Sequence, residues 1–147
     1  MTSITFKIIE FGSNEYQTAI ALRNEILRKP LGLTLTSEEQ AQDKDCIVIA
    51  GFLEDKLCAT AVLVPEGDRL KMRQVAVKED HQGKGFASDM LKFCEDYALN
   101  NGCKEIYCHA RETAIPFYLK NQYLAEGEPF IETTIPHLKM QKVLRRK

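Results

Sequence analysis

The segment 81–87, HQGKGFA, constrains the fold of this chain more than any other stretch of the sequence. It follows the alternating apolar run 75–77 and precedes a helical pattern, so it predicts a turn from a strand into a helix. The first N–H groups of a helix lack intrahelical partners and carry partial positive charge, which suits a phosphate group. Gly83 and Gly85 allow a close approach of backbone and ligand, and Lys84 adds a positive charge. The segment therefore predicts an anion site.

The glycine spacing argues against the two common nucleotide motifs. A P-loop needs G-x-x-x-x-G-K-[ST], and a dinucleotide fingerprint needs G-x-G-x-x-G at the start of a βαβ unit. Only G-x-G is present here, and it follows four strand-like runs. ATP and NAD are therefore disfavoured. By itself, the segment is equally compatible with a tight turn that binds no ligand.

Length and composition indicate one globular domain over residues 1–147. Hydrophobic residues make up 44% of the chain and charged residues 28%, which is ordinary for a globular protein. The formal net charge of −1 argues against a dedicated nucleic-acid binder. The sequence has no apolar run near the roughly 20 residues of a membrane span, and its N-terminus lacks the features of a signal peptide. We expect a cytoplasmic protein that binds neither nucleic acid nor membrane.

The five cysteines predict thiols in a reducing compartment rather than disulfides. Their number is odd, and no two of them form a C-x-x-C pair. Cys103, Cys108 and His109 also lack the paired spacing of a zinc site. We therefore expect no bound metal.

Hydrophobic periodicity predicts an α/β (α+β) fold in the order β-α-α-β-β-β-α-β-α-β-β. Asn14 with Gln17 and Ser37 with Gln40 resemble capping boxes, and each would open a helix. We expect a mixed, mostly antiparallel sheet of six to seven strands flanked by about four helices. The expected strands are residues 4–11, 46–53, 57–64, 70–77, 105–110, 123–134 and 137–144.

Two motifs in this order of elements resemble the GNAT superfamily of acyl-CoA-dependent N-acyltransferases. The first is [QR]-x-x-G-x-[GA] at 82–87, and the second is A-x-x-F-Y at 114–118. The likeness covers nearly the whole chain in element order, although its specific motifs lie within 75–123. The chain is most similar to small bacterial members that end in I-P-H-x-x-M, here residues 135–140.

The resemblance implies a site for acetyl-CoA as cosubstrate. The backbone of the strand before the turn would pair with the pantetheine amides, and the amides of the turn would hold the pyrophosphate. The coenzyme-binding residues implied are Val75, Ala76, Val77, Gln82, Gly83, Lys84, Gly85, Phe86, Ala87, Phe117 and Tyr118.

Tyr118 matches the family tyrosine that protonates the departing thiolate. A phenol with an ordinary pKa of about 10 is protonated at neutral pH, as a general acid must be. Core packing of an aromatic pair is the alternative interpretation. After F-Y-x-K the family usually has a glycine, whereas this chain has Asn121; because asparagine tolerates a left-handed conformation, we expect Asn121 to end the helix.

The general base and the acceptor contacts are less specified. His137, in the terminal motif, is the preferred base, with His109 as the other histidine that could face the site. Glu25, Arg28, Arg73 and His109 are candidate contacts for the acceptor. Each of these residues also suits a solvated surface, where charged side chains usually lie.

The sequence thus predicts an N-acetyltransferase. An unidentified primary amine, on a small molecule or a peptide, would attack acetyl-CoA directly without a metal, and Tyr118 would be the general acid. A non-catalytic acyl-CoA-binding or sensor domain is the alternative, and a structural domain whose turn binds nothing is a third interpretation. Members of the family commonly dimerise through the terminal strands, so a homodimer is also expected.

Overall fold

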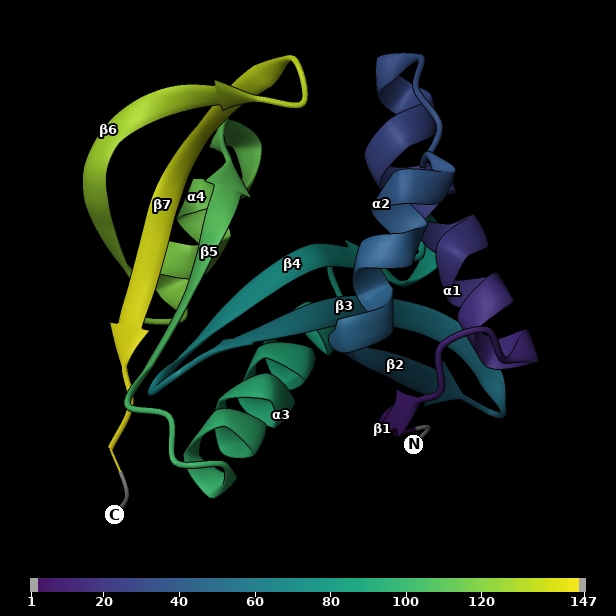
Figure 1. Cartoon of the computed structure of the whole chain (residues 1–147), viewed down its shortest axis with the longest axis horizontal. Helices are drawn as coiled ribbons and strands as arrows, with labels where there is room; N and C mark the ends of the chain where they lie inside the picture. The colour runs from purple at the N-terminus through teal and green to yellow at the C-terminus, as the bar shows by residue number, and fades with distance from the viewer. Residues whose placement is uncertain (1–2, 146–147) are drawn as a thin grey trace. The chain divides into compact units, whose positions relative to one another are not determined.

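A computed structural model describes residues 3–145 of the chain and confirms the predicted fold class and order of elements (Figure 1). Seven strands form a mixed sheet in the order β1-β2-β3-β4-β5-β7-β6. The strands are β1 (Thr5–Ile9), β2 (Ile47–Leu53), β3 (Lys56–Glu66), β4 (Arg69–Val77), β5 (Glu105–Arg111), β6 (Leu124–Glu132) and β7 (Ile135–Val143). The α-helices are α1 (Asn14–Arg23), α2 (Ser37–Gln42), α3 (Phe86–Asn100) and α4 (Ile115–Lys120).

The chain packs as two compact units. The first unit runs to Val64 and includes Gln74–Cys94. The second unit consists of Pro65–Arg73 and the chain from Glu95 onward. Strand β4 and helix α3 are each divided between the two units.

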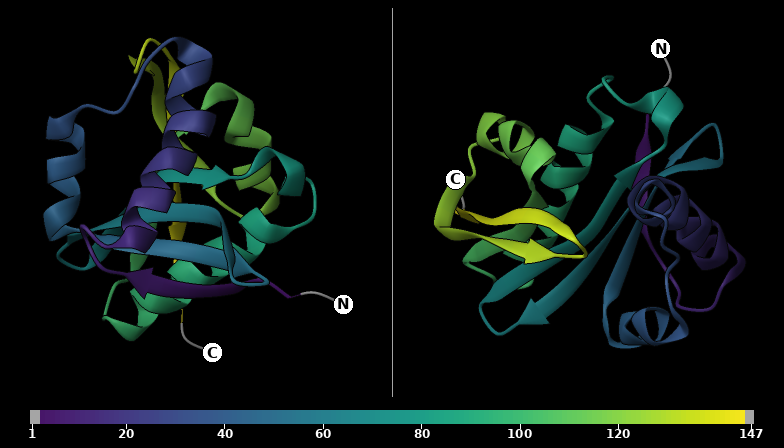
Figure 2. Two further views of the ribbon diagram at one scale, coloured as in Figure 1. Left: turned by 90° about the vertical axis from the view of Figure 1, so that its right-hand side faces the viewer. Right: turned by 90° about the horizontal axis from the view of Figure 1, so that it is seen from above.

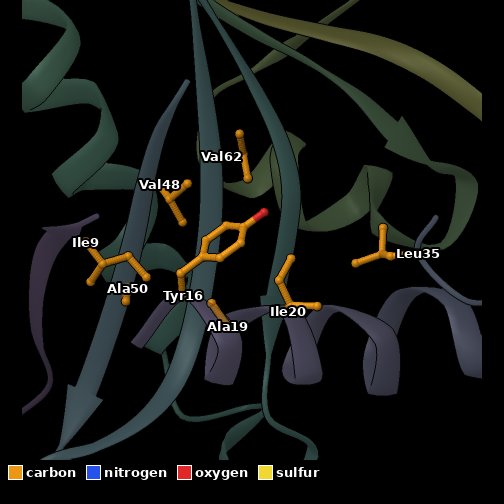
Figure 3. Packing of buried hydrophobic residues seen from close by; sticks show 8 residues of the cluster. All are labelled: Ile9, Tyr16, Ala19, Ile20, Leu35, Val48, Ala50 and Val62. Carbon is orange, nitrogen blue, oxygen red and sulfur yellow. The ribbon is translucent and has the colours of Figure 1, made fainter. Parts of the chain in front are cut away.

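The core of the first unit lies between α1 and the strands β1 to β3. Tyr16, Ala19 and Ile20 follow the i, i+3, i+4 spacing of one helix face, and all three are buried. They pack with buried residues of the strands and of the segment before α2 (Figure 3). On the strands, α1 and α2 occupy one side (Figure 2). The members of this core cluster are Ile9, Tyr16, Ala19, Ile20, Leu35, Val48, Ala50 and Val62.

The N-caps of both N-terminal helices lie one residue earlier than the sequence predicted. The Ser13 side chain, not Asn14, accepts the hydrogen bond from the Tyr16 backbone N–H. Likewise, Thr36 and Glu39 form the capping box of α2, where the sequence had indicated Ser37 and Gln40. Adjacent hydroxyl and amide residues are nearly equivalent as caps, so the sequence alone does not separate them.

The second unit is built on the antiparallel strands β5, β7 and β6. Helix α4 lies against β5 and β7 (Figure 1). The first half of β4 runs parallel to β5, with Leu70 opposite Ile106 and Met72 opposite Cys108. Because side chains alternate along a strand, one face of β5 carries the buried residues Ile106, Cys108 and Ala110, and the opposite face carries Tyr107, which is also buried, and His109.

Asn121 ends α4 as its C-cap, as the sequence predicted, but not in the left-handed conformation that was expected. Asn121 has φ −92° and is not left-handed, whereas the next residue, Gln122, has φ +72°. The Asn121 side chain instead donates a hydrogen bond to the Phe117 carbonyl at 2.9 Å. The left-handed stop is therefore displaced by one residue, because the Asn121 amide group is used to cap the helix.

Candidate functional site

The turn between β4 and α3, in the first unit, presents backbone amides that precede the helical hydrogen-bond ladder, whereas the Gln82 amide donates to the Glu79 carbonyl at 3.2 Å. The first intrahelical bond of α3 runs from the Asp89 N–H to the Gly85 carbonyl at 3.1 Å, so the amides of Phe86 and Ala87 precede the helical hydrogen-bond ladder. Gly83 (φ +79°) and Gly85 (φ +84°) are both left-handed, a conformation that L side chains rarely adopt. A Cβ at either position would meet no atom within 4 Å, so the space over both glycines is open.

The side chain of Gln82 fixes the turn to the end of the preceding strand. Its Nε2 donates to the Val77 carbonyl oxygen at 2.9 Å. Lys84 is exposed, whereas Ala76 and Val77 are buried. Within the first unit, the structure therefore brings together the strand and the turn for which the sequence predicted coenzyme contacts.

Strand β4 is irregular immediately before these residues. Gln74 has φ +54° and begins the part of β4 that belongs to the first unit. Its Oε1 accepts a hydrogen bond from Arg23 Nε of α1 at 3.4 Å. The sequence contained no signal for this irregularity, because Gln74 lies in a run that reads as a regular strand.

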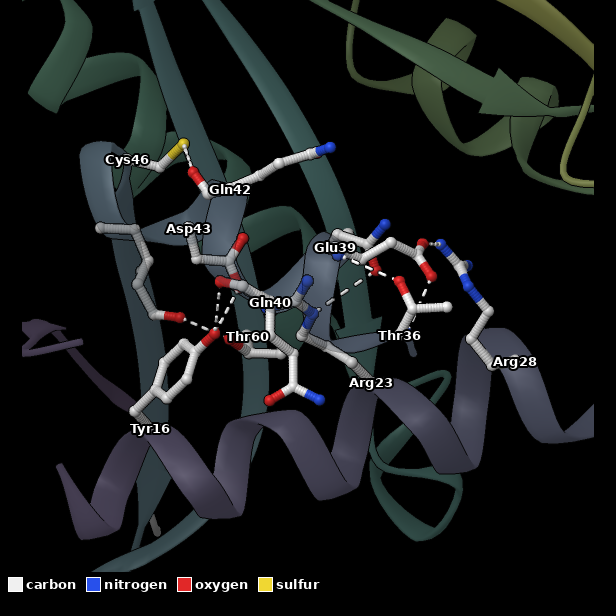
Figure 4. A network of polar contacts seen from close by, with 12 residues as sticks. Tyr16, Arg23, Arg28, Thr36, Glu39, Gln40, Gln42, Asp43, Cys46 and Thr60 are labelled. Atoms are coloured by element: carbon white, nitrogen blue, oxygen red, sulfur yellow. Dashed lines mark hydrogen bonds and ion pairs between the residues drawn. The ribbon is translucent and has the colours of Figure 1, made fainter. Parts of the chain in front are cut away.

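A buried polar network behind α1 was also missed from the sequence (Figure 4). Arg23 and Asp43 are fully buried, and Arg23 Nη1 lies 2.6 Å from Asp43 Oδ2. The Tyr16 hydroxyl donates to the same carboxylate oxygen at 2.6 Å. Burial and the hydrogen bond to Asp43 raise the pKa of Tyr16 above its usual range.

The predicted acceptor contacts on α1 and β4 have different surroundings. Arg28 is buried in a π-helical turn and donates to Glu39 Oε2 at 2.9 Å (Figure 4). Burial acts against ionisation of Glu39, but the hydrogen bonds from Arg28 and Thr36 prevail and lower the pKa of this carboxyl group. Glu25 is exposed and Arg73 is half-buried.

Tyr118 lies in an aromatic cluster of the second unit and is 5% exposed. Its ring meets Phe117 edge to face at 5.1 Å and Tyr123 at 5.4 Å between centroids. A hydrogen bond links the Tyr118 side chain to the Cys108 side chain of β5. Burial raises the pKa of the Cys108 thiol to about 12, and the Tyr118 hydroxyl lowers it in part, so Cys108 is a neutral thiol at physiological pH.

The two histidines of the second unit meet around one carboxylate. His109 Nδ1 of β5 lies 3.0 Å from Glu132 Oε1, and His137 Nε2 of β7 lies 3.8 Å from Glu132 Oε2. Phe130 packs edge to face on His109 and stacks on His137. His109 and His137 were candidates from the sequence, whereas Glu132 and Phe130 were not. Glu132 and Phe130 lie near the histidines because β6 pairs with β7, which places Phe130 opposite His137.

Two negative findings apply to the part of the chain that the structure describes. Among residues 3–145, no group of three or more His, Cys, Asp or Glu side chains is placed to hold a metal ion. In the same range, none of the helices has the length and hydropathy needed to cross a membrane.

The chain belongs to the acetyltransferase (GNAT) family, whose model matches residues 16–123. This family consists of acyl-CoA-dependent acyltransferases, and the matched range includes both the glycine turn and Tyr118. The family assignment made from the two motifs is therefore confirmed.

Solved structures share the fold over nearly their whole length. A Lactobacillus plantarum protein assigned as an N-acetyltransferase is 24% identical, with a TM-score of 0.84, and the match covers 98% of this chain and 99% of that one. An acyl-CoA N-acyltransferase from Pseudomonas aeruginosa is 17% identical, with a TM-score of 0.81 and coverage of 96% and 100%. A GNAT family acetyltransferase from Elizabethkingia anophelis, solved with acetyl-CoA bound, is 16% identical, with a TM-score of 0.74 and coverage of 96% and 98%.

Proposed function

We propose that this protein transfers an acetyl group from acetyl-CoA to a primary amine. The observation that carries the proposal is the turn at the N-terminus of α3, where two left-handed glycines leave open space beside amides that precede the helical ladder. In a chain of the GNAT family, such a turn suits the pyrophosphate of coenzyme A. The Elizabethkingia anophelis structure, which holds acetyl-CoA, supports acetyl-CoA as the donor.

The first unit binds the donor in this proposal. The amides from Gly83 to Ala87 hold the pyrophosphate, and Lys84 adds a positive charge from the surface. The sequence had included Gln82, but its amide already donates to the Glu79 carbonyl. The backbone of Val75–Val77 pairs with the pantetheine amides. Both contacts use main-chain groups, so the conformation of Gly83 and Gly85 matters more than side-chain chemistry.

The second unit supplies the acid. The amine nitrogen attacks the thioester carbon with its lone pair, a C–N bond forms, and the C–S bond breaks. Tyr118 gives its proton to the departing thiolate of coenzyme A, and Phe117 packs beside it. The hydrogen bond between the Tyr118 and Cys108 side chains supports this role, because it places the Tyr118 hydroxyl next to a sulfur atom.

The acceptor is an unprotonated primary amine on a small molecule or a peptide. An ammonium group has no lone pair, so a base must remove a proton before or during attack. Glu25 and Arg73 remain candidates for acceptor contacts. Arg28 is a weaker candidate, since its guanidinium is buried and paired with Glu39. A cytoplasmic location and a homodimer also remain proposals.

Calorimetric titration with acetyl-CoA tests the donor site. We expect binding by the wild-type chain and none by the Gly85→Glu variant, which combines a strained side chain at φ +84° with a negative charge at the pyrophosphate position. Lys92→Glu, an exposed change farther along the same helix, is the matched control for the added charge. Absence of heat with wild-type protein at millimolar acetyl-CoA would refute the donor assignment.

Release of coenzyme A over a panel of amines tests turnover. The detection reagent for thiols reacts with protein cysteines too, and Cys46 is the one cysteine of the five that is not buried. A Cys46→Ser chain therefore gives the cleaner baseline. Binding of acetyl-CoA without turnover of any amine would favour the sensor domain over the enzyme.

A further inference from the structure

Histidines on two strands share one carboxylate in the second unit, and their hydrogen bonds identify which ring nitrogen of each carries a proton. His137 Nδ1 lies 2.9 Å from the Ile135 carbonyl oxygen, which can only accept, so this nitrogen carries hydrogen. His109 Nδ1 lies 3.0 Å from Glu132 Oε1, and an ionised carboxylate likewise only accepts. In each neutral imidazole the lone pair is therefore on Nε2.

The two lone pairs differ in their surroundings. The side chain of His137 is 5% exposed, and its Nε2 faces Glu132 Oε2 at 3.8 Å. The side chain of His109 is 27% exposed, and its Nδ1, not its Nε2, is directed to Glu132. A proton acceptor must be reachable by the group that gives up the proton, and His109 Nε2 meets this condition better than His137 Nε2.

The nearby cation Lys139 does not compete with His109 for Glu132. Lys139 lies directly opposite His109 in the pairing of β5 with β7. However, its ammonium group is held 2.5 Å from Glu126 Oε2 and lies over the Tyr107 ring, so Lys139 has its own partners. Glu132 therefore remains the carboxylate that orients the imidazole of His109.

We propose that His109 is the general base of the transfer reaction and that Glu132 positions it. The proposal rests on the proposed function. As the C–N bond forms, the amine proton passes to His109 Nε2, while the thiolate receives its proton from Tyr118. The Tyr118 hydroxyl contacts Cys108, the residue before His109, and consecutive residues point to opposite faces of a strand. The acid and the base thus approach β5 from opposite sides. The proton that leaves the amine and the proton that reaches the thiolate therefore follow separate paths. The sequence had favoured His137 for the base.

Nitrogen NMR of the imidazole rings tests the assignment in the free protein, without any substrate. At about pH 8.5, where ordinary imidazoles are neutral, we expect both His109 and His137 to carry hydrogen on Nδ1. The Glu132→Ala variant should lose this preference at His109 and keep it at His137. Glu128→Ala, which removes an exposed carboxylate from the same strand, should change neither ring. Hydrogen on Nε2 of His109 in the wild-type protein would overturn the proposal.

Turnover of an amine substrate tests the catalytic role. His109→Gln should lower kcat by about 10²- to 10⁴-fold, the usual contribution of a general base, with little change in KM for acetyl-CoA. His137→Gln should lower kcat far less. Imidazole added to a His109→Ala variant should restore part of the rate, and Glu132→Asp should retain more activity than Glu132→Ala.

The outcomes separate this proposal from the proposed function. If the wild-type chain acetylates an amine and His109→Gln retains kcat within about threefold, His109 is not the base and the transferase stands. A large loss in His137→Gln alone would assign the role to His137. If the wild-type chain binds acetyl-CoA but turns over no amine, the transferase itself is refuted, whatever the tautomer of His109.

Discussion

Replacing Arg23 by methionine should destabilise the protein far more than breaking an ion pair of similar length on its surface. Arg23 and Asp43 are fully buried and lie 2.6 Å apart, whereas Lys7 and Glu15 lie 2.7 Å apart with side chains 56% and 41% exposed. Removal of one partner of a buried pair leaves an uncompensated charge and costs about 3–5 kcal/mol. Lys7→Met should cost about 1 kcal/mol or less.

The size of the effect follows from what remains around Asp43. In Arg23→Met the carboxylate keeps the Tyr16 hydroxyl as a donor at 2.6 Å but loses its cationic partner. For a chain of this length, 3–5 kcal/mol corresponds to a fall in Tm of about 6–20 °C. That free energy is a third or more of the stability of many domains, which is about 5–15 kcal/mol.

A double variant separates the cost of an orphaned charge from the value of the pair itself. Within the described residues, Arg23 Nη2 and Asp43 Oδ1 have no hydrogen-bond partner, so the pair is incompletely compensated in the folded state. Arg23→Met combined with Asp43→Leu should therefore be more stable than Arg23→Met alone. Urea denaturation followed by circular dichroism gives the midpoint and the slope for each variant. A double variant less stable than either single variant would refute the reasoning.

Three further predictions concern single side chains. Tyr118→Phe should lower kcat by about 10²- to 10⁴-fold and leave acetyl-CoA affinity nearly unchanged in calorimetry; equal turnover would remove the acid role. Gln122→Gly should raise the free energy of unfolding by about 1 kcal/mol, because φ +72° strains glutamine and not glycine, and unchanged stability in urea would contradict this. Burial and the hydrogen bond to Glu66 raise the pKa of Tyr107 to about 12 from 10, so this hydroxyl contributes stability that is complete below about pH 10 and is lost as pH rises to about 12. The loss of stability with pH over that interval should be smaller in Tyr107→Phe, and an identical pH profile would exclude this contribution.

The sequence predicts most of the fold because its signals are local. The apolar spacing of Tyr16, Ala19 and Ile20 and the glycines around Lys84 depend on neighbours within one turn of chain. Caps are local as well, but several adjacent residues suit the same position, so Ser13 and Thr36 were missed by one residue. Residue spacing alone therefore predicts that a helix is present but does not identify the residue at which it begins.

The side chains around the candidate base could not be predicted, because they depend on strand register. His109 and Glu132 are 23 residues apart and meet only because β7 lies between β5 and β6 in the sheet. Along β6 the register shifts between Glu126 and Phe130, so counting residues from the turn would place Glu126 opposite Gln141, whereas it pairs with Lys139. A carboxylate that orients a histidine is therefore visible only once the pairing is known.

The buried pair also bears on the strand that precedes the glycine turn. A left-handed glutamine costs about 1–2 kcal/mol, so the surrounding structure must hold Gln74 at φ +54°. Arg23 Nε donates to the Gln74 side chain, and Arg23 is itself held by Asp43. Residues 75–77, the segment proposed to pair with pantetheine, begin at the next position. The conformation of this segment is thus linked to α1 through the buried Arg23. This link is a reason to keep a polar network at a position where apolar residues would cost less free energy to bury.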